Sequence, residues 1–408
     1  MKLLQTETLQ NARQKFLESL KNRREIIKID LMDAESQILA EDVISAGAIP
    51  HFRRSTVDGY AVISADTQGA SESIPVFLDA VEEVCIGDSA KFQLKNGQCA
   101  YVPTGGMVPD GADAMVMVEY CEPFDQNSIA VYESVSVGRH VVNIGEDMES
   151  GGVVLKKGTK LRPQEIGALA SAGVALVPVF KPLTLTIIST GDELVTIDRS
   201  PKPGQVRDIN TYALESLARK HGFVVVSTHV LRDEEEILRS VISEAMQKSD
   251  IVAISGGSSQ GKKDVTAKII GVLSEPGVFV HGISIKPGKP TILGYDEKSQ
   301  TGLIGLPGHP AAAMIIFQLV VVWAKNKLFG QTDEKCLFAR MKTNLGSDPG
   351  KTTCQMVRLL EEEGGYIAEP IFGKSGLVSL LTAADGYTLI DMNKEGLRRD
   401  ELVKVWMI

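Results

Sequence analysis

The stretch LTLTIISTGDEL (residues 183–194) decides the fold of the largest part of this chain, because an apolar run of strand length ends there in a Gly-Asp-Glu loop. Two later stretches have the same plan, IVAISGGSSQGKKD (residues 251–264) and GLIGLPGHP (residues 302–310). Helical patterns such as TYALESLARKHG (residues 211–222) stand between the strand patterns. Strands that alternate with helices indicate parallel βαβ units, so we predict an α/β domain over residues 181–327.

The rest of the 408-residue chain has other patterns, and this length favours two to four domains. Short β-type runs separated by Gly and Pro clusters predict a β-rich domain over residues 46–147. Residues 328–408 return to β character and predict a small C-terminal domain. Helical and strand patterns mix in residues 1–45 and 148–180, which we assign to one further domain. The predicted fold class is multidomain α/β plus β, with a three-layer α/β domain around a mostly parallel sheet, a β-rich lobe and a C-terminal β-barrel-like domain.

The bulk composition narrows the function. With 43% hydrophobic and 23% charged residues the chain is globular, and its net charge of −9 disfavours nucleic acid and acidic lipid as partners. Five scattered cysteines without a CxxC pair argue against structural zinc and fit a reducing compartment. The N-terminus lacks a signal-peptide core. The longest apolar stretch, residues 311–324, contains Gln318 and is too short to span a bilayer, so we expect a buried helix in a cytoplasmic protein.

Small and hydroxylated residues follow the predicted strands at the edge where ligands collect in open α/β sheets. Gly256 and Gly257 allow a close backbone approach, and the hydroxyls of Ser258 and Ser259 can bond phosphate or pterin. Such a loop can equally be a simple turn. It matches neither the dinucleotide fingerprint nor a P-loop, which disfavours a nucleotide-dependent oxidoreductase.

Lysines and carboxylates add charge near the same strand ends. Lys286 and Lys289 flank a Pro-Gly turn and suit an oxyanion or pyrophosphate, although an isolated turn of this kind can be a solvated basic loop. Magnesium takes one or two carboxylates together with substrate phosphates. Asp192, Glu193, Asp233 and Asp264 are the candidates, but Asp233 and Asp264 can instead cap the helices that follow them.

Other chemistry finds little support in the sequence. From spacing alone Asp58, Thr104 and Asp147 belong to turns of the β-rich domain. None of the six histidines has a ligand partner at helical spacing, and no nucleophile elbow is present. Metal-assisted transfer at a phosphate is therefore the chemistry that these residues can best support.

Taken in order, the motifs FRRSTVDGYAV, PTGGMVPDGADAMVMVE, GED, STGDEL, SGGSSQG, IKPGKP and GLPG resemble the molybdopterin molybdenumtransferase family, which includes the C-terminal domain of gephyrin. The resemblance covers nearly the whole chain. It implies an elongated homodimer of four-domain subunits, in which residues 1–45 and 148–180 form the dimer stem and residues 181–327 bind molybdopterin. Such enzymes take adenylylated molybdopterin and molybdate, cleave the adenylate with Mg²⁺, and release AMP and molybdenum cofactor.

The resemblance also implies roles for individual residues. Asp264 and Ser259, with Asp233 nearby, match positions at the pyrophosphate and the metal, and Glu193 matches the acid of the GDEL loop. The implied molybdate and substrate contacts are Lys286, Lys289, Pro290, Pro307, Pro310, Arg358 and Ser375. The implied catalytic positions of the β-rich domain are Asp58, Thr104 and Asp147, which would reach the site of the partner subunit.

Some residues depart from the family's pattern. Arg53 and Arg54 stand where Asp-Asn is usual, and Ala312 replaces a serine after the GLPG loop, which removes one expected molybdate contact. Lys262 and Lys263 add positive charge beside the expected pyrophosphate. Two alternatives stay open: a non-catalytic molybdopterin-binding scaffold, and the same reaction with tungstate. The sequence also leaves open whether a separate adenylyltransferase delivers the substrate by direct contact.

Overall fold

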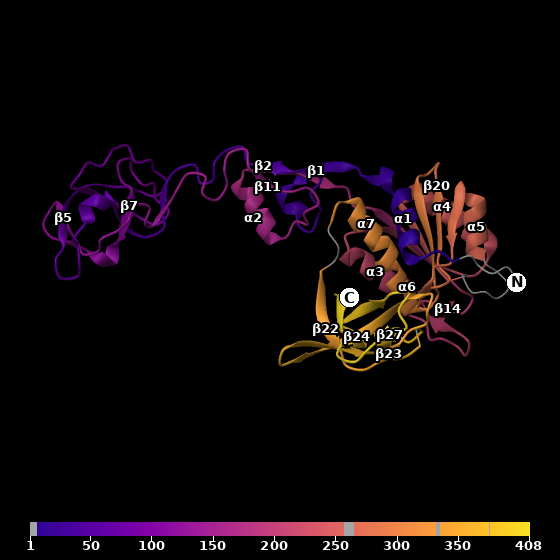
Figure 1. Cartoon of the computed structure of the whole chain (residues 1–408). Coiled ribbons are helices and arrows are strands. Elements are labelled where there is room, and N and C mark those ends of the chain that lie inside the picture. Colours follow the sequence, from indigo (N-terminus) through magenta and orange to yellow (C-terminus); the bar gives the residue numbers. More distant parts are fainter. Residues whose placement is uncertain (1–5, 257–264, 332–334, 375) are drawn as a thin grey trace.

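The computed structural model describes residues 6–256, 265–331, 335–374 and 376–408. The molecule is elongated (Figure 1). A β-rich lobe lies at one end, a small mixed domain follows it, and an α/β body with a C-terminal β domain forms the other end. This arrangement confirms the predicted multidomain α/β plus β class.

The β-rich lobe is built on a six-stranded sheet with the order β7-β4-β6-β5-β9-β8. Its alternating apolar residues form two buried clusters, one around Met115 and one around Leu78. The strands of the lobe are β3 (Arg54–Ser55), β4 (Gly59–Val62), β5 (Val76–Glu83), β6 (Gln98–Val102), β7 (Ala114–Met117), β8 (Cys121–Pro123), β9 (Ser128–Val131) and β10 (Val141–Val142).

The mixed domain joins the lobe to the body. The chain passes through it twice, because β1 (Ile26–Asp30) pairs with β12 (Leu176–Phe180), and β2 (Val43–Ile44) pairs with β11 (Val153–Leu155). Helix α2 (Pro163–Ser171) covers these strands. The first helix, α1 (Leu9–Ser19), packs elsewhere, since its buried face joins the core of the α/β body. Our predicted boundary had placed α1 with the mixed domain.

The α/β body contains a six-stranded sheet with the order β16-β13-β17-β21-β20-β18. The first four strands are parallel, β20 runs antiparallel to both of its neighbours, and β18 returns to the common direction, as expected for a mostly parallel sheet. Helices α1, α3 and the long helix from Pro310 cover one face, and α4 and α5 cover the other. The elements are β13 (Thr184–Thr190), β14 (Leu194–Val195), β15 (Val206–Arg207), α3 (Asn210–Lys220), β16 (Val224–Leu231), α4 (Glu235–Lys248), β17 (Ile251–Ser255), α5 (Val265–Leu273), β18 (Pro276–His281), β20 (Ile292–Asp296) and β21 (Thr301–Leu306).

One helix of the body is long and apolar. It consists of α6 (Pro310–Ile316), the π-helical turn η5 (Phe317–Val322) and α7 (Trp323–Leu328). Its 19 residues have the length and composition of a membrane span, yet 78% of its most apolar window is buried in the molecule. The prediction of a buried helix is confirmed, but the argument from length was wrong. Gln318 does not interrupt the helix, because its side chain is itself buried within the π-helical turn.

The C-terminal strands form a second six-stranded sheet, with the order β19-β24-β25-β22-β28-β26 and an additional β24–β26 pairing that closes it. Strand β19 (Ile285–Lys286) belongs by sequence to the α/β body, and it pairs in parallel with β24. The two domains therefore share a sheet. The other elements are β22 (Cys336–Met341), β23 (Leu345–Gly346), β24 (Thr352–Glu362), β25 (Gly365–Pro370), α8 (Ser379–Ala383), β26 (Gly386–Ile390), β27 (Gly396–Leu397) and β28 (Leu402–Met407).

Candidate active site at the carboxyl edge of the parallel sheet

The three loops singled out in the sequence leave the sheet at the same edge. Ser189 of β13 lies beside Ser255 of β17, and Ser255 lies beside Leu306 of β21. All three strands are parallel, so the STGDEL, SGG and GLPGHP loops begin at one level. The tertiary structure thus brings these three loops, which are far apart in the sequence, to one edge of the sheet.

Gly256 occupies a position that admits no side chain. Its φ is +109°, and a Cβ atom there would lie 2.0 Å from the carbonyl oxygen of Thr190. A Cβ on Gly308, in the neighbouring loop, would lie 3.9 Å from Cα of Gly256. The two glycines bring backbone segments of adjacent loops into close approach. Gly257, Ser258, Ser259 and Asp264, which the sequence analysis placed next to Gly256, lie outside the described residues.

Two carboxylates meet at the ends of β13 and β16. Asp233 accepts a hydrogen bond of 2.6 Å from the Thr190 hydroxyl, and its backbone N–H donates to Asp192 Oδ1 at 3.3 Å. The alternative role of Asp233 as a helix cap was wrong, because α4 begins two residues later, at Glu235, and its N-cap is Glu234. Asp233 instead binds to the end of a sheet strand. Glu193 is exposed and follows Asp192 in the same loop.

The described carboxylates can be compared with what a magnesium ion requires. No group of three or more His, Cys, Asp or Glu residues that could hold a metal occurs among them. Magnesium needs only one or two protein carboxylates when substrate phosphates and water supply the other ligands. Asp233 and Asp192 fit this requirement, and the neighbouring Asp264 lies outside the described residues.

The lysine turn lies where the α/β body meets the C-terminal domain. Lys286 is the last residue of β19, and its Nζ lies 2.9 Å from Oδ2 of Asp348 in the C-terminal domain. The bond to the Lys286 ammonium lowers the pKa of the Asp348 carboxyl. Gly288 holds the turn against α6, because a Cβ there would lie 2.4 Å from Cδ1 of Ile316. Lys289 is exposed, and the turn therefore presents its ammonium group to solvent.

The remaining predicted substrate contacts lie in several places. Pro307 accepts a 3.4 Å hydrogen bond from the Ser255 hydroxyl, and Pro310 is the first residue of α6. Arg358 is exposed on β24 opposite Glu369. Thr353, on the same strand, is the pairing partner of Lys286. Arg358 lies five residues further along, so its backbone is roughly 17 Å from that of Thr353.

Ser375 lies outside the described part of the chain, so its predicted molybdate contact has no structural description here. The residue after it is informative. A Cβ on Gly376 would lie 3.8 Å from Cδ2 of His309 in the GLPGHP loop. The C-terminal domain therefore touches the loops of the α/β body at this point.

Two functional candidates escaped the sequence analysis. Asn210, the first residue of α3, donates from its side-chain nitrogen to Ser255 Oγ at 2.7 Å and to the Gly308 carbonyl at 2.8 Å. Asp208, just before it, is 2% exposed, and its Oδ2 has no hydrogen-bond partner among the described residues. The available signal was the polar run RDIN (residues 207–210) ahead of a helix, to which we had assigned no role.

The predicted residues of the β-rich lobe form their own group. Asp58 Oδ1 accepts a hydrogen bond of 2.7 Å from the Thr104 backbone N–H, so these two are brought together. Asp147 is exposed in a turn after β10. Asp58 and Thr104 belong to loops of the lobe, and the lobe lies at the far end of the molecule from the α/β body (Figure 1). Asp147 lies where the chain leaves the lobe, and its backbone N–H donates to the Ile49 carbonyl at 3.1 Å. A single chain therefore does not unite Asp58 and Thr104 with Asp233.

The structure describes the surroundings of two departures from the family's pattern, Arg53 and Ala312. The Arg53 guanidinium donates to the carbonyls of Ala112 at 2.7 Å and Pro109 at 3.1 Å, and so holds a loop of the lobe. Ala312 is 3% exposed within α6, so a serine hydroxyl at this position would be buried. Lys262 and Lys263 lie outside the described residues.

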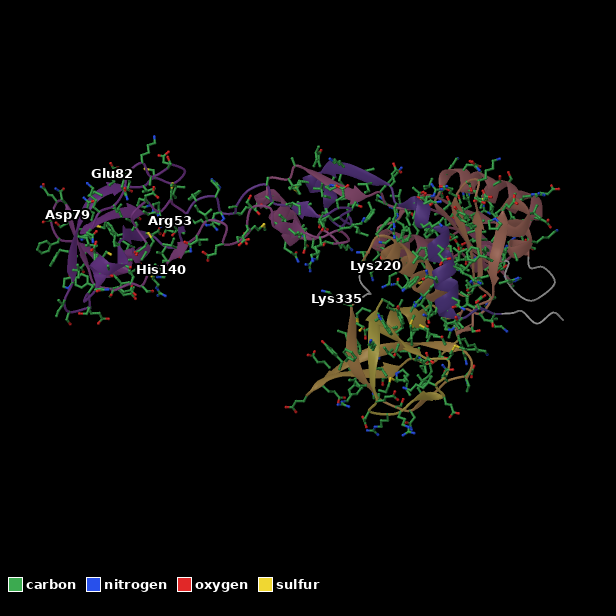
Figure 2. The ribbon with its side chains drawn as sticks, turned by 45° about the horizontal axis from the view of Figure 1, so that its top comes forward. Arg53, Asp79, Glu82, His140, Lys220 and Lys335 are labelled. Carbon is green, nitrogen blue, oxygen red and sulfur yellow. The ribbon has the colours of Figure 1, made fainter. Side chains whose placement is uncertain are left out.

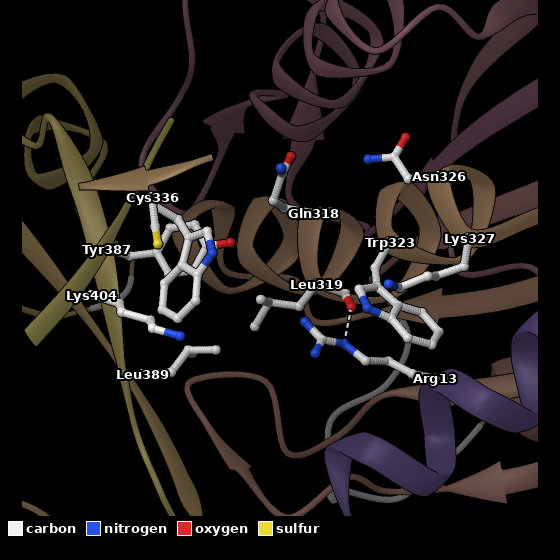
Figure 3. Close-up of a pocket in the computed structure, with 11 residues that line it drawn as sticks. Arg13, Gln318, Leu319, Trp323, Asn326, Lys327, Cys336, Tyr387, Leu389 and Lys404 are labelled. Carbon is white, nitrogen blue, oxygen red and sulfur yellow. Dashed lines mark hydrogen bonds between the residues drawn. The ribbon is translucent and has the colours of Figure 1, made fainter. Parts of the chain in front are cut away.

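A pocket of about 240 Å³ lies between α1, the long helix and the C-terminal domain (Figure 3). Arg13 and Lys404 face it together with the rings of Trp323 and Trp406, and Arg13 donates to the Leu319 carbonyl. A larger cleft of about 680 Å³ is lined mainly by apolar side chains of α3, α6 and the C-terminal domain. Neither pocket is lined by the aspartates or glycines of the sheet edge, so both are separate from the candidate active site.

The fold and the sheet edge define a multidomain α/β protein with a candidate ligand site at the carboxyl edge of its parallel sheet. Three family models match the chain: "MoeA N-terminal region (domain I and II)" at residues 7–173, "Probable molybdopterin binding domain" at 186–326, and "MoeA C-terminal region (domain IV)" at 339–408. The chain belongs to the MoeA family of molybdopterin molybdenumtransferases. It is an enzyme of molybdenum cofactor biosynthesis.

Individual relatives agree with this assignment. The molybdopterin molybdenumtransferase of Haemophilus influenzae is 30% identical over 98% of both chains. That of Bacillus subtilis is 29% identical over 93% of this chain and 89% of its own length. A molybdopterin biosynthesis MoeA protein from Pyrococcus horikoshii has a solved structure that is similar with a TM-score of 0.80, at 35% identity over 99% of both chains. The family predicted from the ordered motifs is confirmed.

Proposed function

We propose that this enzyme inserts molybdate into adenylylated molybdopterin and releases AMP in a Mg²⁺-dependent step. The observation that carries the proposal is the meeting of the Asp192–Asp233 pair and the Gly256 loop at one sheet edge. Carboxylates there can hold a cation against phosphate oxygens, and a glycine backbone permits phosphate to approach closely. The molybdopterin-binding family model covers this edge.

The residues of the edge then have distinct tasks. Thr190 orients the Asp233 carboxylate through its hydroxyl, and the Gly256 and Gly308 backbones provide a surface without side chains for the pyrophosphate. Bound Mg²⁺ supplies neutralisation of the charge that develops on the pyrophosphate as AMP leaves. Asp264 is proposed as a further ligand on the basis of the family resemblance.

Molybdate is proposed to bind at the lysine turn. An ammonium group has three donors, and Lys286 uses one of them for Asp348. The remaining donors and the exposed Lys289 can bind a tetrahedral oxyanion beside the dithiolene. Pro290, Arg358 and Ser375 stay proposed contacts from the family resemblance. Because tungstate has the same shape and charge, the same turn is expected to accept it.

The proposed enzyme is a homodimer in which the lobe of one subunit serves the site of the other. The lobe that carries Asp58 and Thr104, and that ends near Asp147, lies apart from the α/β body that carries Asp233 (Figure 1). A second subunit gives these lobe residues access to a site without bending the molecule. All five cysteines are free thiols, which fits a cytoplasmic enzyme.

The test is molybdate-dependent AMP release from adenylylated molybdopterin, followed by chromatography with Mg²⁺ present. Asp233→Asn and Asp264→Asn should each lower the rate about a hundredfold, because a preorganised electrostatic contact contributes about 3 kcal/mol to the barrier. Glu234→Gln is the matched control, since this neighbouring carboxylate makes no side-chain cap bond at α4. Substrate binding without AMP release by the wild type would instead support a molybdopterin-binding scaffold.

A further inference from the structure

The start of helix α3 is tied to two ligand loops at once. Asn210 donates both protons of its side-chain amide, one to Ser255 Oγ at 2.7 Å and one to the Gly308 carbonyl at 2.8 Å. Ser255 ends β17, whereas Gly308 lies in the loop after β21. A single amide group therefore spans the two loops.

The loops that Asn210 joins touch each other through their backbones. Gly308 lies next to Gly256, with an ideal Cβ position 3.9 Å from the Gly256 Cα, and Ser255 Oγ donates to the Pro307 carbonyl at 3.4 Å. Glycine loops have many accessible conformations, so their spacing needs an external restraint. Among the described side chains, the amide of Asn210 bonds to both sides of this contact.

Burial makes this restraint effective. Asn210 is 9% exposed and Ser255 is 2% exposed, so water competes little for these hydrogen bonds. The amide Oδ1 of Asn210 has no partner within the described structure. The side-chain hydrogen bonds of Asn210 that the structure describes therefore both go to the two ligand loops.

We propose that Asn210 is a positioning residue for the transfer reaction. It sets the spacing between the Gly256 and Gly308 loops, and the pyrophosphate of the substrate lies on these loops. The expected effect of Asn210 on the rate of AMP release rests on the proposed function. Asn210 itself need not touch the substrate. It acts through the two backbone segments, and a shift of about 1 Å in such a segment can lower a rate about a hundredfold.

The same helix end offers a matched control. Thr211 makes a buried hydroxyl bond of 2.8 Å to Ser189 Oγ, which anchors α3 to β13 and does not join the two glycine loops. Asn210→Ala removes the bridge, and Asn210→Asp keeps the size while placing an oxygen against the Gly308 carbonyl. Thr211→Val removes one buried hydrogen bond from the same turn. A purely structural role predicts the same behaviour for all three variants.

Two measurements on the full chain test the proposal. In hydrogen exchange, backbone amides of the Gly308 loop should exchange about tenfold faster in both Asn210 variants but not in Thr211→Val. In steady-state AMP release, both Asn210 variants should lose about tenfold to a hundredfold in kcat with little change in KM, whereas Thr211→Val keeps kcat.

Failure of the positioning role can be distinguished from failure of the proposed function. Unchanged exchange in the Asn210 variants, or equal effects in Thr211→Val, would overturn the positioning role. A wild-type protein that releases no AMP would refute the proposed function, and the exchange measurement would still decide whether Asn210 sets the loop spacing.

Discussion

Asp233 and Glu193 are both acidic residues near the carboxyl edge of the sheet, but their surroundings differ. Asp233 is half-buried and accepts a 2.6 Å hydrogen bond from Thr190, while Glu193 is exposed in the loop. A carboxylate held by a neighbouring hydroxyl keeps one orientation and binds a cation with less loss of entropy. At the residue scale we therefore expect Asp233 to contribute more to Mg²⁺ binding than Glu193.

Thr190→Val tests this interpretation. Removal of the hydroxyl frees the Asp233 carboxylate, and loss of such an outer-shell partner typically lowers metal affinity about tenfold to a hundredfold. We expect the Mg²⁺ concentration for half-maximal AMP release to rise by about that factor. Thr186→Val is the control, because Thr186 lies on the same strand and bonds to Ser227 and Ser249 away from the edge. An equal rise in both variants would contradict the role of Thr190.

At the scale of elements, the end of α3 is sensitive to protonation. His221 is the C-cap of α3, and burial together with the nearby Lys325 and Lys220 lowers its pKa to about 4. Lys325, from the long helix, donates to the His221 carbonyl at 2.7 Å and carries a positive charge into this buried place. The neutral imidazole is therefore the form that the fold accommodates.

The pH dependence of stability follows from this shift. The folded pKa of about 4 lies below the ordinary value of 6.5, so the contribution of neutral His221 is complete above pH 6.5 and is lost as the pH falls toward 4. The loss can approach about 3 kcal/mol at the acid end of this range. His221→Gln should flatten the fall in urea-unfolding free energy between pH 7 and pH 5, whereas His51→Gln, in the exposed start of the lobe, should not. A wild-type stability independent of pH in this range would exclude the effect.

At the scale of the whole molecule, the lobe differs from the rest of the chain in its net charge. Residues 46–147 contain 15 Asp and Glu but only 5 Lys and Arg, so the lobe alone has a net charge of −10 and the rest of the chain is nearly neutral. Asp79 and Glu82 lie on this lobe (Figure 2). An acidic lobe is a poor primary site for an anionic substrate. Substrate binding is therefore expected in the α/β body, with the lobe contributing only the ends of its loops.

The proposed exchange of lobes between subunits can be tested by mixing two inactive variants. Asp58→Asn disables the lobe, and Lys286→Ala disables the body. A mixed dimer then combines one intact lobe with one intact body. If dimers form at random, half are mixed and each has one complete site, so we expect about a quarter of the wild-type rate of AMP release. No recovery after unfolding and refolding the mixture, with mixed dimers shown by mass spectrometry, would mean that each lobe serves its own body.

Much of the architecture follows from local sequence. Apolar runs of strand length that end in glycine loops specify a parallel sheet with a ligand edge, since strand propensity and glycine conformation are properties of short segments. The alternation of β-type runs with Gly and Pro likewise defined the lobe and the C-terminal domain. The ordered motifs were sufficient to recognise the family. The site residues of the edge remain predictions, of which the structure brings Asp233 and Gly256 together.

Only the tertiary structure decided the features that depend on contacts between distant segments. The pairing of β19 with β24, the packing of α1 on the body, and the bridge from Asn210 to Gly308 join residues far apart in the chain. The same holds for the separation of the lobe from the α/β body, for which the proposed site uses a second subunit. Such contacts are set by how whole elements pack, because burial and hydrogen bonding reward the best arrangement of the complete chain and leave no periodic pattern in the sequence.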